Sequence, residues 1–406
     1  MDFLDLSPKN FSSFKGIISP EKSKSIANRV LLLQALSGNV FSIDFPGNSD
    51  DVKLMQAALN NNSGLIDAGM AGTVLRFLTA GFSIMPGNRV LTGSERLKQR
   101  PLNYLTDALI ELGAEIRFKE ERGFAPLEIT GKALDGGKIK INASVSSQFI
   151  SALMLIGPYL KQGLEIELMG KAVSNSYLEL TGGIMQQLGF EVEFNSNKII
   201  VKHENPIKQV FKIEADWSAA AYWLAFVALI PNAKISLGGL FENSLQGDRG
   251  VLELLHQFGV ETIWQNDELI AKHNSLIVKP KTFKYDFTQM PDQAQTFAFL
   301  CAAMGIETEL TGLQTLKHKE TDRIMALHTE LEKLGIIVQS DSNSIRLKGS
   351  IKVKEATLLT YDDHRMAMAG SLIATQIPVG IENPDVVSKS YPDFWRHLVS
   401  ISRLKA

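Results

Sequence analysis

Hydrophobic positions along the chain follow a helical period and then change to the alternation of strands, and this succession repeats. Ile324, Leu327 and Leu331 are spaced to share one helix face, which ends before Gly335. Three other predicted helices end at a glycine in the same way. The four glycines recur at intervals of about seventy residues: Gly113, Gly189, Gly259 and Gly335. Each is expected in the left-handed conformation that closes a helix, so the pattern predicts one repeated α/β unit.

A second series of predicted helices is almost wholly apolar beyond the first turn, as expected of helices buried on most sides. These helices begin near Lys24, Gly72, Ser146, Trp217, Asp292 and His364. Two further members of the first series are predicted at 50–59 and 392–399. Short strands are predicted between the helices, at 138–141, 164–168, 199–201, 235–237, 276–278 and 345–347. Six pairs of helices with strands between them predict an α/β protein of six similar units.

Six units divide naturally into two domains of three, and a length of 406 residues also favours two domains over one core. The predicted first domain is continuous and spans 19–214. The predicted second domain is discontinuous and combines 1–18 with 215–406, because the first residues can pair back with the second half. We expect the active site in a cleft between the domains, where helix N-termini from both sides can gather.

Composition narrows the class of protein. A net charge of −2 argues against a nucleic-acid binder and against a basic membrane-surface protein. The single cysteine, Cys301, excludes a disulfide framework and favours a reducing cytoplasm. The N-terminus lacks the layout of a signal peptide, and the apolar run 217–230 is shorter than the ~20 residues of a membrane span. The seven histidines show no metal-ligand spacing, so no metal site is expected.

Cations at helix starts are the main chemical signal. Lys319 and Arg323 flank the start of a predicted helix, where the helix dipole disfavours each positive charge by roughly 0.3–1 kcal/mol. A solvated charged turn is one explanation. The other is an anion site, in which helix N–H groups, a lysine and an arginine face one phosphate or carboxylate. Glu320 between them would then be a carboxyl group able to move a proton beside that anion.

Similar polar starts recur on five of the six apolar helices, and this recurrence favours the anion site. Lys24, Ser25 and Arg29 lie within about one and a half turns of one helix start. Asp292 begins a nearly uncharged helix and can be either a cap or a base against a hydroxyl group. Further candidates at helix starts or in nearby loops are Gly72, Arg76, Arg96, Arg100, Ser146, Ser147, Gln148, Ser174, Tyr177, Arg365 and Lys389.

The order and spacing of these motifs resemble one family, over the chain from about Ser19 to the C-terminus. The motifs are S-K-S-x-x-N-R at Ser23, D-D-V at Asp50, A-G-T-x-x-R-F at Ala71, L-T-G-x-x-R at Leu91, S-S-Q-F at Ser146, N-S-x-Q-G-D at Asn243, P-D at Pro291, K-E-T-D-R at Lys319, D-H-R-M-A-M at Asp363 and K-S-Y-P-D-F at Lys389. They are similar to those of the 5-enolpyruvylshikimate-3-phosphate synthases, or 3-phosphoshikimate 1-carboxyvinyltransferases. The resemblance implies two domains, each of three βαβαββ units, of the enolpyruvyl transferase, inside-out α/β barrel type.

The resemblance also implies an activity. Enzymes of this family transfer the enolpyruvyl group of phosphoenolpyruvate to the 5-hydroxyl of shikimate 3-phosphate and release phosphate, a step of chorismate and aromatic amino acid biosynthesis. No metal or cofactor is implied, and a monomer is expected. The two phosphorylated small molecules would be the partners, with neither nucleic acid nor membrane.

Roles for single residues follow from the matching motifs. Asp292 resembles the base that takes the 5-hydroxyl proton, Glu320 resembles the acid that protonates the methylene carbon, and Lys24 resembles a third catalytic group. The implied shikimate 3-phosphate contacts are Lys24, Ser25, Arg29, Ser146, Ser147, Gln148, Ser174, Tyr177, Asp292, Thr315 and Lys319. The implied phosphoenolpyruvate contacts are Lys24, Gly72, Arg96, Gln148, Arg323, Arg365 and Lys389.

The chain departs from the family pattern at a few positions. Met70 and Thr315 each stand where an asparagine is usual, and Ala27 stands where a serine is frequent. The loop 20–25 is one residue longer than usual and lacks its glycine. Met70 and the altered loop bear on phosphoenolpyruvate affinity and on the response to glyphosate, and Thr315 bears on one phosphoshikimate contact. None of these changes removes a proposed charged catalytic group.

Two other functions are weighed against this one. The sister enolpyruvyl transferase that acts on UDP-N-acetylglucosamine usually has a cysteine or aspartate in a mobile loop, whereas Cys301 lies in an apolar helix pattern. A non-catalytic relative that only binds a phosphorylated metabolite would not need Asp292, Glu320 and Lys24 together. A turnover assay separates both from the shikimate enzyme.

Overall fold

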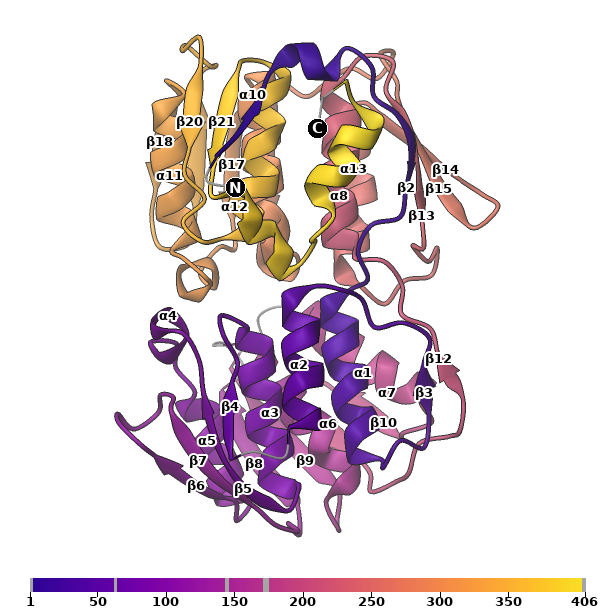
Figure 1. Ribbon diagram of the computed structural model, residues 1–406, viewed down its shortest axis with the longest axis vertical. Coiled ribbons are helices and arrows are strands. Elements are labelled where there is room, and N and C mark those ends of the chain that lie inside the picture. Colours follow the sequence, from indigo (N-terminus) through magenta and orange to yellow (C-terminus); the bar gives the residue numbers. More distant parts are fainter. Residues whose placement is uncertain (1–2, 62–63, 143–145, 171–174, 404–406) are drawn as a thin grey trace. The chain divides into compact units, whose positions relative to one another are not determined.

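The computed structural model describes residues 3–61, 64–142, 146–170 and 175–403. The chain forms two compact units (Figure 1). Unit 1 combines Met1–Lys22 with Glu214–Ala406, and unit 2 is Ser23–Ile213. The described strands form six sheets, in agreement with the six predicted α/β units, and these sheets stay separate, so the described strands close no barrel. No described helix is both long and apolar enough to cross a membrane.

Unit 2 contains two complete βαβαββ repeats and one short one. The first repeat has the strand order β4-β5-β7-β6, and the second has the order β10-β11-β9-β8. The elements of the first are β4 (Leu65–Asp67), α3 (Gly72–Ile84), β5 (Gly87–Thr92), α4 (Glu95–Lys98), α5 (Asn103–Glu111), β6 (Glu115–Phe118) and β7 (Leu127–Gly131). Those of the second are β8 (Gly137–Asn142), α6 (Ser147–Ile156), β9 (Leu164–Met169), α7 (Asn175–Gln187), β10 (Val192–Asn195) and β11 (Lys198–Val201). The short repeat has α1 (Lys24–Leu36), β3 (Ser42–Ile43), α2 (Asp50–Asn60) and β12 (Val210–Phe211).

Unit 1 also contains three repeats, and the N-terminal strands complete two of them. Strand β2 (Lys15–Ile18) pairs in parallel with β13, which lies more than two hundred residues later in the chain. That repeat continues with α8 (Trp217–Leu229), β13 (Lys234–Gly238), α9 (Val251–His256), β14 (Val260–Gln265) and β15 (Glu268–His273). The next has β16 (Thr282–Asp286), α10 (Ala294–Met304), β17 (Glu307–Thr311), α11 (Arg323–Lys333), β18 (Ile337–Ser340) and β19 (Ile345–Lys348). The last has β20 (Ala356–Leu358), α12 (His364–Gly370), β21 (Val379–Glu382) and α13 (Phe394–Ile401), with β1 (Phe3–Leu6) antiparallel to β21.

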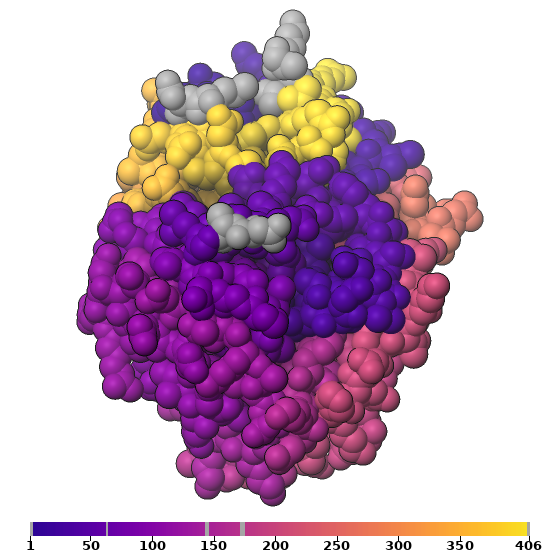
Figure 2. Space-filling view, turned by 60° about the horizontal axis from the view of Figure 1, so that its bottom comes forward, coloured from indigo at the N-terminus to yellow at the C-terminus, as the bar shows by residue number. Residues whose placement is uncertain are grey.

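Short 3₁₀ helices connect many of these elements: η1 (Pro8–Phe11), η2 (Gly157–Tyr159), η3 (Gly247–Gly250), η4 (Phe287–Gln289), η5 (Pro291–Gln293), η6 (Leu316–His318), η7 (Ser371–Thr375) and η8 (Pro384–Lys389). The N-terminal segment also joins the C-terminal region outside the sheets, since Arg403 N donates to Asn10 O at 2.7 Å. Figure 2 shows indigo atoms of the first residues beside yellow atoms of the last ones, in the upper part of the view.

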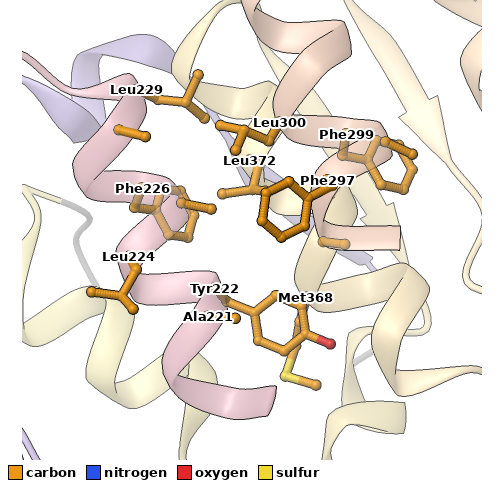
Figure 3. Close-up of a cluster of buried hydrophobic side chains, with 14 of the residues drawn as sticks. Ala221, Tyr222, Leu224, Phe226, Leu229, Phe297, Phe299, Leu300, Met368 and Leu372 are labelled. Atoms are coloured by element: carbon orange, nitrogen blue, oxygen red, sulfur yellow. The ribbon is translucent and has the colours of Figure 1, made fainter. Parts of the chain in front are cut away.

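Apolar helices fill the interior of each unit, and the sheets lie outside them (Figure 1). In unit 1 every residue of α8 is buried, as the apolar run 217–230 predicts. Figure 3 shows Tyr222 and Phe226 of α8 facing Phe297 of α10 and Met368 of α12. Helices packed on all sides are held rigidly along their length, so the polar residues at their first turns have fixed positions.

The repeated glycines behave as predicted. Gly113, Gly189, Gly259 and Gly335 have φ values of +94°, +93°, +90° and +81°. These values belong to the left-handed region, which a residue with a Cβ enters at a cost of roughly 1–2 kcal/mol. The four predicted helix ends are therefore confirmed.

One predicted strand is wrong, and two predicted helices begin later than expected. Residues 276–278 form no strand, and Leu276 and Val278 are 88% and 92% exposed. Asn274 Oδ1 accepts a hydrogen bond from Leu276 N at 2.9 Å, which turns the chain away from the sheet after β15. The helix predicted near Asp292 begins at Ala294 after η5, and the one predicted at 392–399 begins at Phe394.

Candidate active site

The start of α11 carries the centre of the candidate site in unit 1. Asp322 is the N-cap, and its side chain accepts a hydrogen bond from Met325 N. Arg323, the first helical residue, is 1% exposed although it is a cation at the positive end of the helix dipole. Three carboxylates compensate this charge: Asp363 at 2.6 Å from Nε, Asp292 at 2.9 Å from Nη1 and Glu320 at 3.0 Å from Nη2.

Three more cations surround the same carboxylates. Arg365 Nη2 lies 3.0 Å from Asp292 Oδ2, and Lys319 Nζ lies 3.5 Å from Asp292 Oδ1. Lys389 Nζ lies 3.6 Å from Glu320 Oε1. The structure therefore brings together all six residues that the sequence assigned to this part of the chain as charged site residues: Asp292, Lys319, Glu320, Arg323, Arg365 and Lys389.

The charges in this cluster shift the pKa values of its members. Burial alone would raise the pKa of the Asp292 carboxyl, but Arg365, Lys319 and Arg323 outweigh burial and hold that pKa well below its usual range. Burial alone would lower the pKa of Arg323, but the carboxylates of Asp363, Glu320 and Asp292 raise it. Asp292 is therefore ionised and able to accept a proton, and Arg323 stays charged.

A strained turn positions Asp363 and Arg365. Tyr361 and Asp362 both have φ of +54°, which is uncommon for residues other than glycine and more so for Tyr361 than for Asp362. Glu330 of α11 holds this turn, because its carboxylate accepts hydrogen bonds from Tyr361 Oη at 2.5 Å and from Leu359 N at 3.1 Å. Asp363 then caps α12 by accepting a hydrogen bond from Arg365 N at 2.9 Å. Helix α11 thus fixes both ends of the segment that leads to α12.

Unit 1 contains a fourth carboxyl group near this cluster, which the sequence analysis did not assign to the site. Asp248, in η3, is 6% exposed and accepts hydrogen bonds from Ser218 Oγ and from Gln293 Nε2. Burial and, after it, the negative charge of Asp292 raise the pKa of Asp248 to about 6. Its only sequence signal is its place in the N-S-x-Q-G-D motif, which does not reveal the fold neighbours.

In unit 2, the first turns of α1 present another set of predicted residues. Lys24 Nζ lies 2.9 Å from Asp51 Oδ2 at the start of α2. Arg29 is 2% exposed and donates to Thr181 Oγ1 at 2.7 Å and to the carbonyl of Ser25 at 2.6 Å. Weaker contacts reach Ser151 Oγ at 3.3 Å and the carbonyl of Tyr177 at 3.5 Å. Arg29 is thus bonded to neutral acceptors of unit 2.

The start of α3 gathers a second set in unit 2. Arg76 Nη1 donates to the carbonyl of Gly72 and to Gln148 Oε1, both at 3.1 Å. Gln148 Nε2 donates to Thr73 Oγ1, also at 3.1 Å. A Cβ atom at Gly72 would lie 2.5 Å from Arg100 Nη1 and 2.7 Å from Arg76 Nη1, so a side chain there would displace at least one of these guanidinium groups. The sequence marked Arg76 and Arg100 as cations, but their meeting at Gly72 required the fold.

The other predicted residues lie as follows. Ser146 caps α6 by accepting a hydrogen bond from Gln148 N, and Ser147 is the first residue of that helix. Tyr177 is in the first turn of α7, and Arg96 is in α4. Thr315 precedes η6, and its hydroxyl is buried without a hydrogen-bond partner. Ser174 lies outside the described residues. Across the described ranges, no group of three or more His, Cys, Asp or Glu side chains is placed to hold a metal ion.

A model of the EPSP synthase (3-phosphoshikimate 1-carboxyvinyltransferase) family matches residues 59–398. The chain belongs to the EPSP synthase family. Two relatives named 3-phosphoshikimate 1-carboxyvinyltransferase, from Bacteroides fragilis strains YCH46 and ATCC 25285, are 42% and 43% identical over 95% of this chain and 95% of each relative. A relative of the same name from Photobacterium damsela subsp. piscicida is 35% identical over 99% of this chain and all of its own length.

Solved structures agree with this family in fold. An EPSP synthase from Acinetobacter baumannii superposes with a TM-score of 0.76 at 21% identity, and covers 99% of this chain and 98% of its own. The enolpyruvyl transferase NikO from Streptomyces tendae gives a TM-score of 0.74 at 15% identity, with 98% and 97% of the two chains covered. The α/β fold predicted from the sequence is therefore confirmed, as is membership of the EPSP synthase family.

Proposed function

We propose that this chain transfers the enolpyruvyl group of phosphoenolpyruvate to the 5-hydroxyl of shikimate 3-phosphate, and thereby forms 5-enolpyruvylshikimate 3-phosphate and phosphate. One observation carries the proposal: two carboxylates suited to proton transfer, Asp292 and Glu320, converge on the buried guanidinium of Arg323. Membership of the EPSP synthase family supports the choice of substrates.

The reaction needs one proton donor and one proton acceptor. Glu320 protonates the methylene carbon of phosphoenolpyruvate, which leaves the adjacent carbon cationic. Asp292 takes the proton of the 5-hydroxyl as its oxygen attacks that carbon. The resulting tetrahedral intermediate has a methyl group. Phosphate then leaves while one methyl proton returns to the Glu320 carboxylate, and the carbon–carbon double bond is restored. The low pKa of Asp292 keeps this carboxylate ionised in the free protein, and an anionic substrate that takes over its cation contacts would raise that pKa and strengthen it as a base.

The cations of unit 1 hold the anionic groups of phosphoenolpyruvate. Arg323, Arg365 and Lys389 contact carboxylates in the free protein, and a bound phosphate or carboxylate would take over part of these contacts. Fixed donors aimed at developing charge are worth roughly 3–4 kcal/mol of barrier each. The displaced carboxylates would then be less stabilised as anions, which favours the protonated Glu320 that the first step requires.

The residues of unit 2 complete the proposed site. We assign Lys24 to both substrates and to catalysis, and Gly72 and Arg96 to phosphoenolpyruvate, with Gln148 touching both substrates. The proposed shikimate 3-phosphate contacts are Lys24, Ser25, Arg29, Ser146, Ser147, Gln148, Ser174, Tyr177, Asp292, Thr315 and Lys319. Arg29 reaches the substrate only after exchanging some of its contacts to Ser25 and Thr181.

The remaining parts of the proposal concern the whole molecule. The domains 19–214 and 1–18 plus 215–406 would close on the substrates, with the active site between them. The enzyme would act as a monomer in the cytoplasm, in chorismate biosynthesis, without metal or cofactor. The single buried cysteine, Cys301, whose pKa burial raises to about 12, fits a reducing compartment and takes no part in this chemistry.

The test is phosphate release from phosphoenolpyruvate with shikimate 3-phosphate, beside a parallel reaction with UDP-N-acetylglucosamine. Release with shikimate 3-phosphate alone is the expected result. Release with the sugar nucleotide alone would replace the proposed activity by that of the sister transferase. No release with either, from folded protein that still binds shikimate 3-phosphate, would reduce the chain to a binding protein.

A further inference from the structure

Asp248 is a buried carboxyl group that the proposed reaction does not use. It lies in η3, far along the sequence from Lys24, Asp292 and Glu320, the proposed catalytic residues. Its Oδ2 atom accepts a hydrogen bond from Gln293 Nε2 at 2.8 Å and one from Ser218 Oγ. Burial of a carboxylate carries a large desolvation cost, which hydrogen bonds from Ser218 and Gln293 partly offset. These two residues are therefore the ones whose side chains Asp248 can hold in place.

The first donor connects Asp248 to Arg365. Ser218 Oγ lies 3.4 Å from Arg365 Nη2, the same nitrogen that lies 3.0 Å from Asp292 Oδ2. A serine hydroxyl has one hydrogen and two lone pairs. When Ser218 donates its hydrogen to Asp248, its lone pairs are left for the N–H groups of Arg365. Asp248 thus sets the direction of the hydroxyl that helps to hold this guanidinium.

The second donor connects Asp248 to Asp292 along the chain. Gln293 directly follows Asp292 in η5, and its side-chain amide is tied to Asp248. The Asp248 carboxylate therefore holds Gln293, which follows the proposed base Asp292 in the chain. It also holds the hydroxyl of Ser218, which lies beside Arg365, the guanidinium partner of Asp292. Removing either link would let the Asp292–Arg365 pair change its orientation without removing either charged group.

We propose that Asp248 is a positioning residue which, through Ser218 and Gln293, orients Arg365 and Asp292 for the binding and reaction of phosphoenolpyruvate. This inference rests on the proposed function, because it assigns Asp248 a part in that same site.

Protonation of Asp248 should reverse the link to Ser218. A protonated carboxyl group can donate its own hydrogen to Ser218 Oγ, which turns the serine hydrogen toward Arg365 and removes an acceptor from the guanidinium. Burial and the charge of Asp292 raise the pKa of Asp248 to about 6, so this reversal falls within an accessible pH range. The groups that act on Asp248 are Asp292 and Gln293 of η5, Arg365 of α12 and the neutral Ser218 of α8. The titratable residues on the two helices packed against η3 are the cap Asp216 of α8 and the exposed Glu253 and His256 of α9.

The test compares the wild type with Asp248→Asn from about pH 5 to about pH 8, in phosphate-release assays of the full chain. Above pH 6 we expect the KM for phosphoenolpyruvate to rise roughly threefold to tenfold in the variant, the range of one lost hydrogen bond. The KM for shikimate 3-phosphate should stay the same. Below pH 6 the two proteins should converge, because the wild-type carboxyl is then also neutral. The phosphate groups of both substrates also gain a proton near pH 6. The measured quantity is therefore the ratio of the variant KM to the wild-type KM, because the protonation of the substrates affects both values equally.

Matched variants separate positioning from general damage. Glu214→Gln neutralises another buried carboxylate of unit 1, which accepts a hydrogen bond from Ser244 Oγ at 2.6 Å and contacts none of the proposed catalytic residues. It should leave the KM ratio at one across the pH range. Ser218→Ala should reproduce the part of the Asp248→Asn effect that passes through Ser218, and the double variant should add little to Asp248→Asn, because that variant already breaks the Ser218 link. Melting curves confirm that each variant is folded.

Three outcomes would overturn the inference. An unchanged KM ratio in folded Asp248→Asn would show that the carboxylate does not orient the site. If Asp248→Asn changed kcat and both KM values together, and the control Glu214→Gln changed them equally, Asp248 would have only a structural role. Full additivity with Ser218→Ala would break the proposed link. If the wild type itself does not turn over these substrates, the proposed function fails first and the inference fails with it.

Discussion

Arg29 in unit 2 and Arg323 in unit 1 are the most deeply buried of the described arginines, and both lie near the start of a helix. Their surroundings are opposite in charge. Arg29 of unit 2 donates to hydroxyl and carbonyl groups, which carry no net charge. Arg323 of unit 1 contacts the three carboxylates of Asp292, Glu320 and Asp363. Burial lowers the pKa of Arg29 to about 10, whereas the three carboxylates raise that of Arg323 against the effect of burial.

The difference indicates a division of labour. The positive charge of Arg29 is not cancelled by a carboxylate within its own contacts, so it remains available to attract an anionic substrate. The charge of Arg323 is balanced by groups that can also carry protons, as the proposed transfer steps require. Lys24 of unit 2 does pair with a carboxylate, that of Asp51. The two units therefore differ in degree in how far carboxylates balance their cations.

The largest expected effect is on turnover, and it tests whether unit 1 carries the protons. Glu320→Gln removes the proposed acid while keeping its size, so kcat should fall by about 10²–10⁴-fold. Phosphate release measures the loss. Glu332→Gln, an exposed change on the same helix, is the control and should leave kcat within a factor of about two. A fall of less than tenfold in Glu320→Gln would assign the proton to another group.

Removing the balanced arginine should cost the fold most. Arg323→Met leaves three carboxylates close together without their shared cation, and the free energy of unfolding should drop by roughly 3–5 kcal/mol. The deficit should shrink as the pH falls, because protonation relieves the repulsion. Urea denaturation at several pH values measures it. A deficit that does not depend on pH would contradict the charge-balance explanation.

Removing the unbalanced arginine should cost less. Arg29→Met leaves Ser151 Oγ and Thr181 Oγ1 able to bond each other, since they already lie 2.9 Å apart. We expect a loss of about 2 kcal/mol in unfolding free energy, with no acid-dependent recovery. The same denaturation series provides the comparison. A loss as large as that of Arg323→Met would remove the distinction between the two units.

A pair of tyrosine variants sharpens the comparison at the smallest scale. Tyr361 donates to the charged Glu330 in unit 1, and Tyr159 donates to the carbonyl of Leu33 in unit 2 at 3.1 Å. Tyr361→Phe should lower the free energy of unfolding by about 1.5 kcal/mol and Tyr159→Phe by about 1 kcal/mol or less. Tyr361→Phe alone should also raise the KM for phosphoenolpyruvate, because its turn positions Arg365. Equal KM values in both variants would show that the turn does not act on the site.

Local signals were enough to predict much of the fold. The apolar run of α8 and the helix-ending glycines such as Gly335 depend on neighbours in sequence, and both were predicted correctly. The strand expected at 276–278 failed because Leu276 and Val278 are apolar and yet exposed, so hydrophobicity alone did not report burial. Local pattern also could not predict the two-stranded sheet of β3 and β12. Each strand has only two residues, and the strands lie far apart in the chain, at 42–43 and 210–211.

The candidate site divides in the same way. Cations at helix starts, such as Lys319 and Arg323, are visible in the sequence because they oppose the helix dipole. Of the carboxylates that balance Arg323, Glu320 lies in the same segment, whereas Asp292 and Asp363 come from separate segments, and no local rule joins either of them to Arg323. The sequence showed Asp248 only as part of a motif and not as part of the site. Its link to Arg365 passes through Ser218, thirty residues earlier in the chain, and no local pattern reveals that link.

The most direct test of the account is the mass of the product formed in deuterium oxide. If Glu320 protonates the methylene carbon, the intermediate carries a CH₂D group, and loss of a proton leaves deuterium in the vinyl group of the product. We predict 5-enolpyruvylshikimate 3-phosphate with deuterium at that position, formed at a much lower rate by Glu320→Gln. Product formed at the normal rate without vinyl deuterium would contradict protonation of the methylene carbon and, with it, the role given to Glu320.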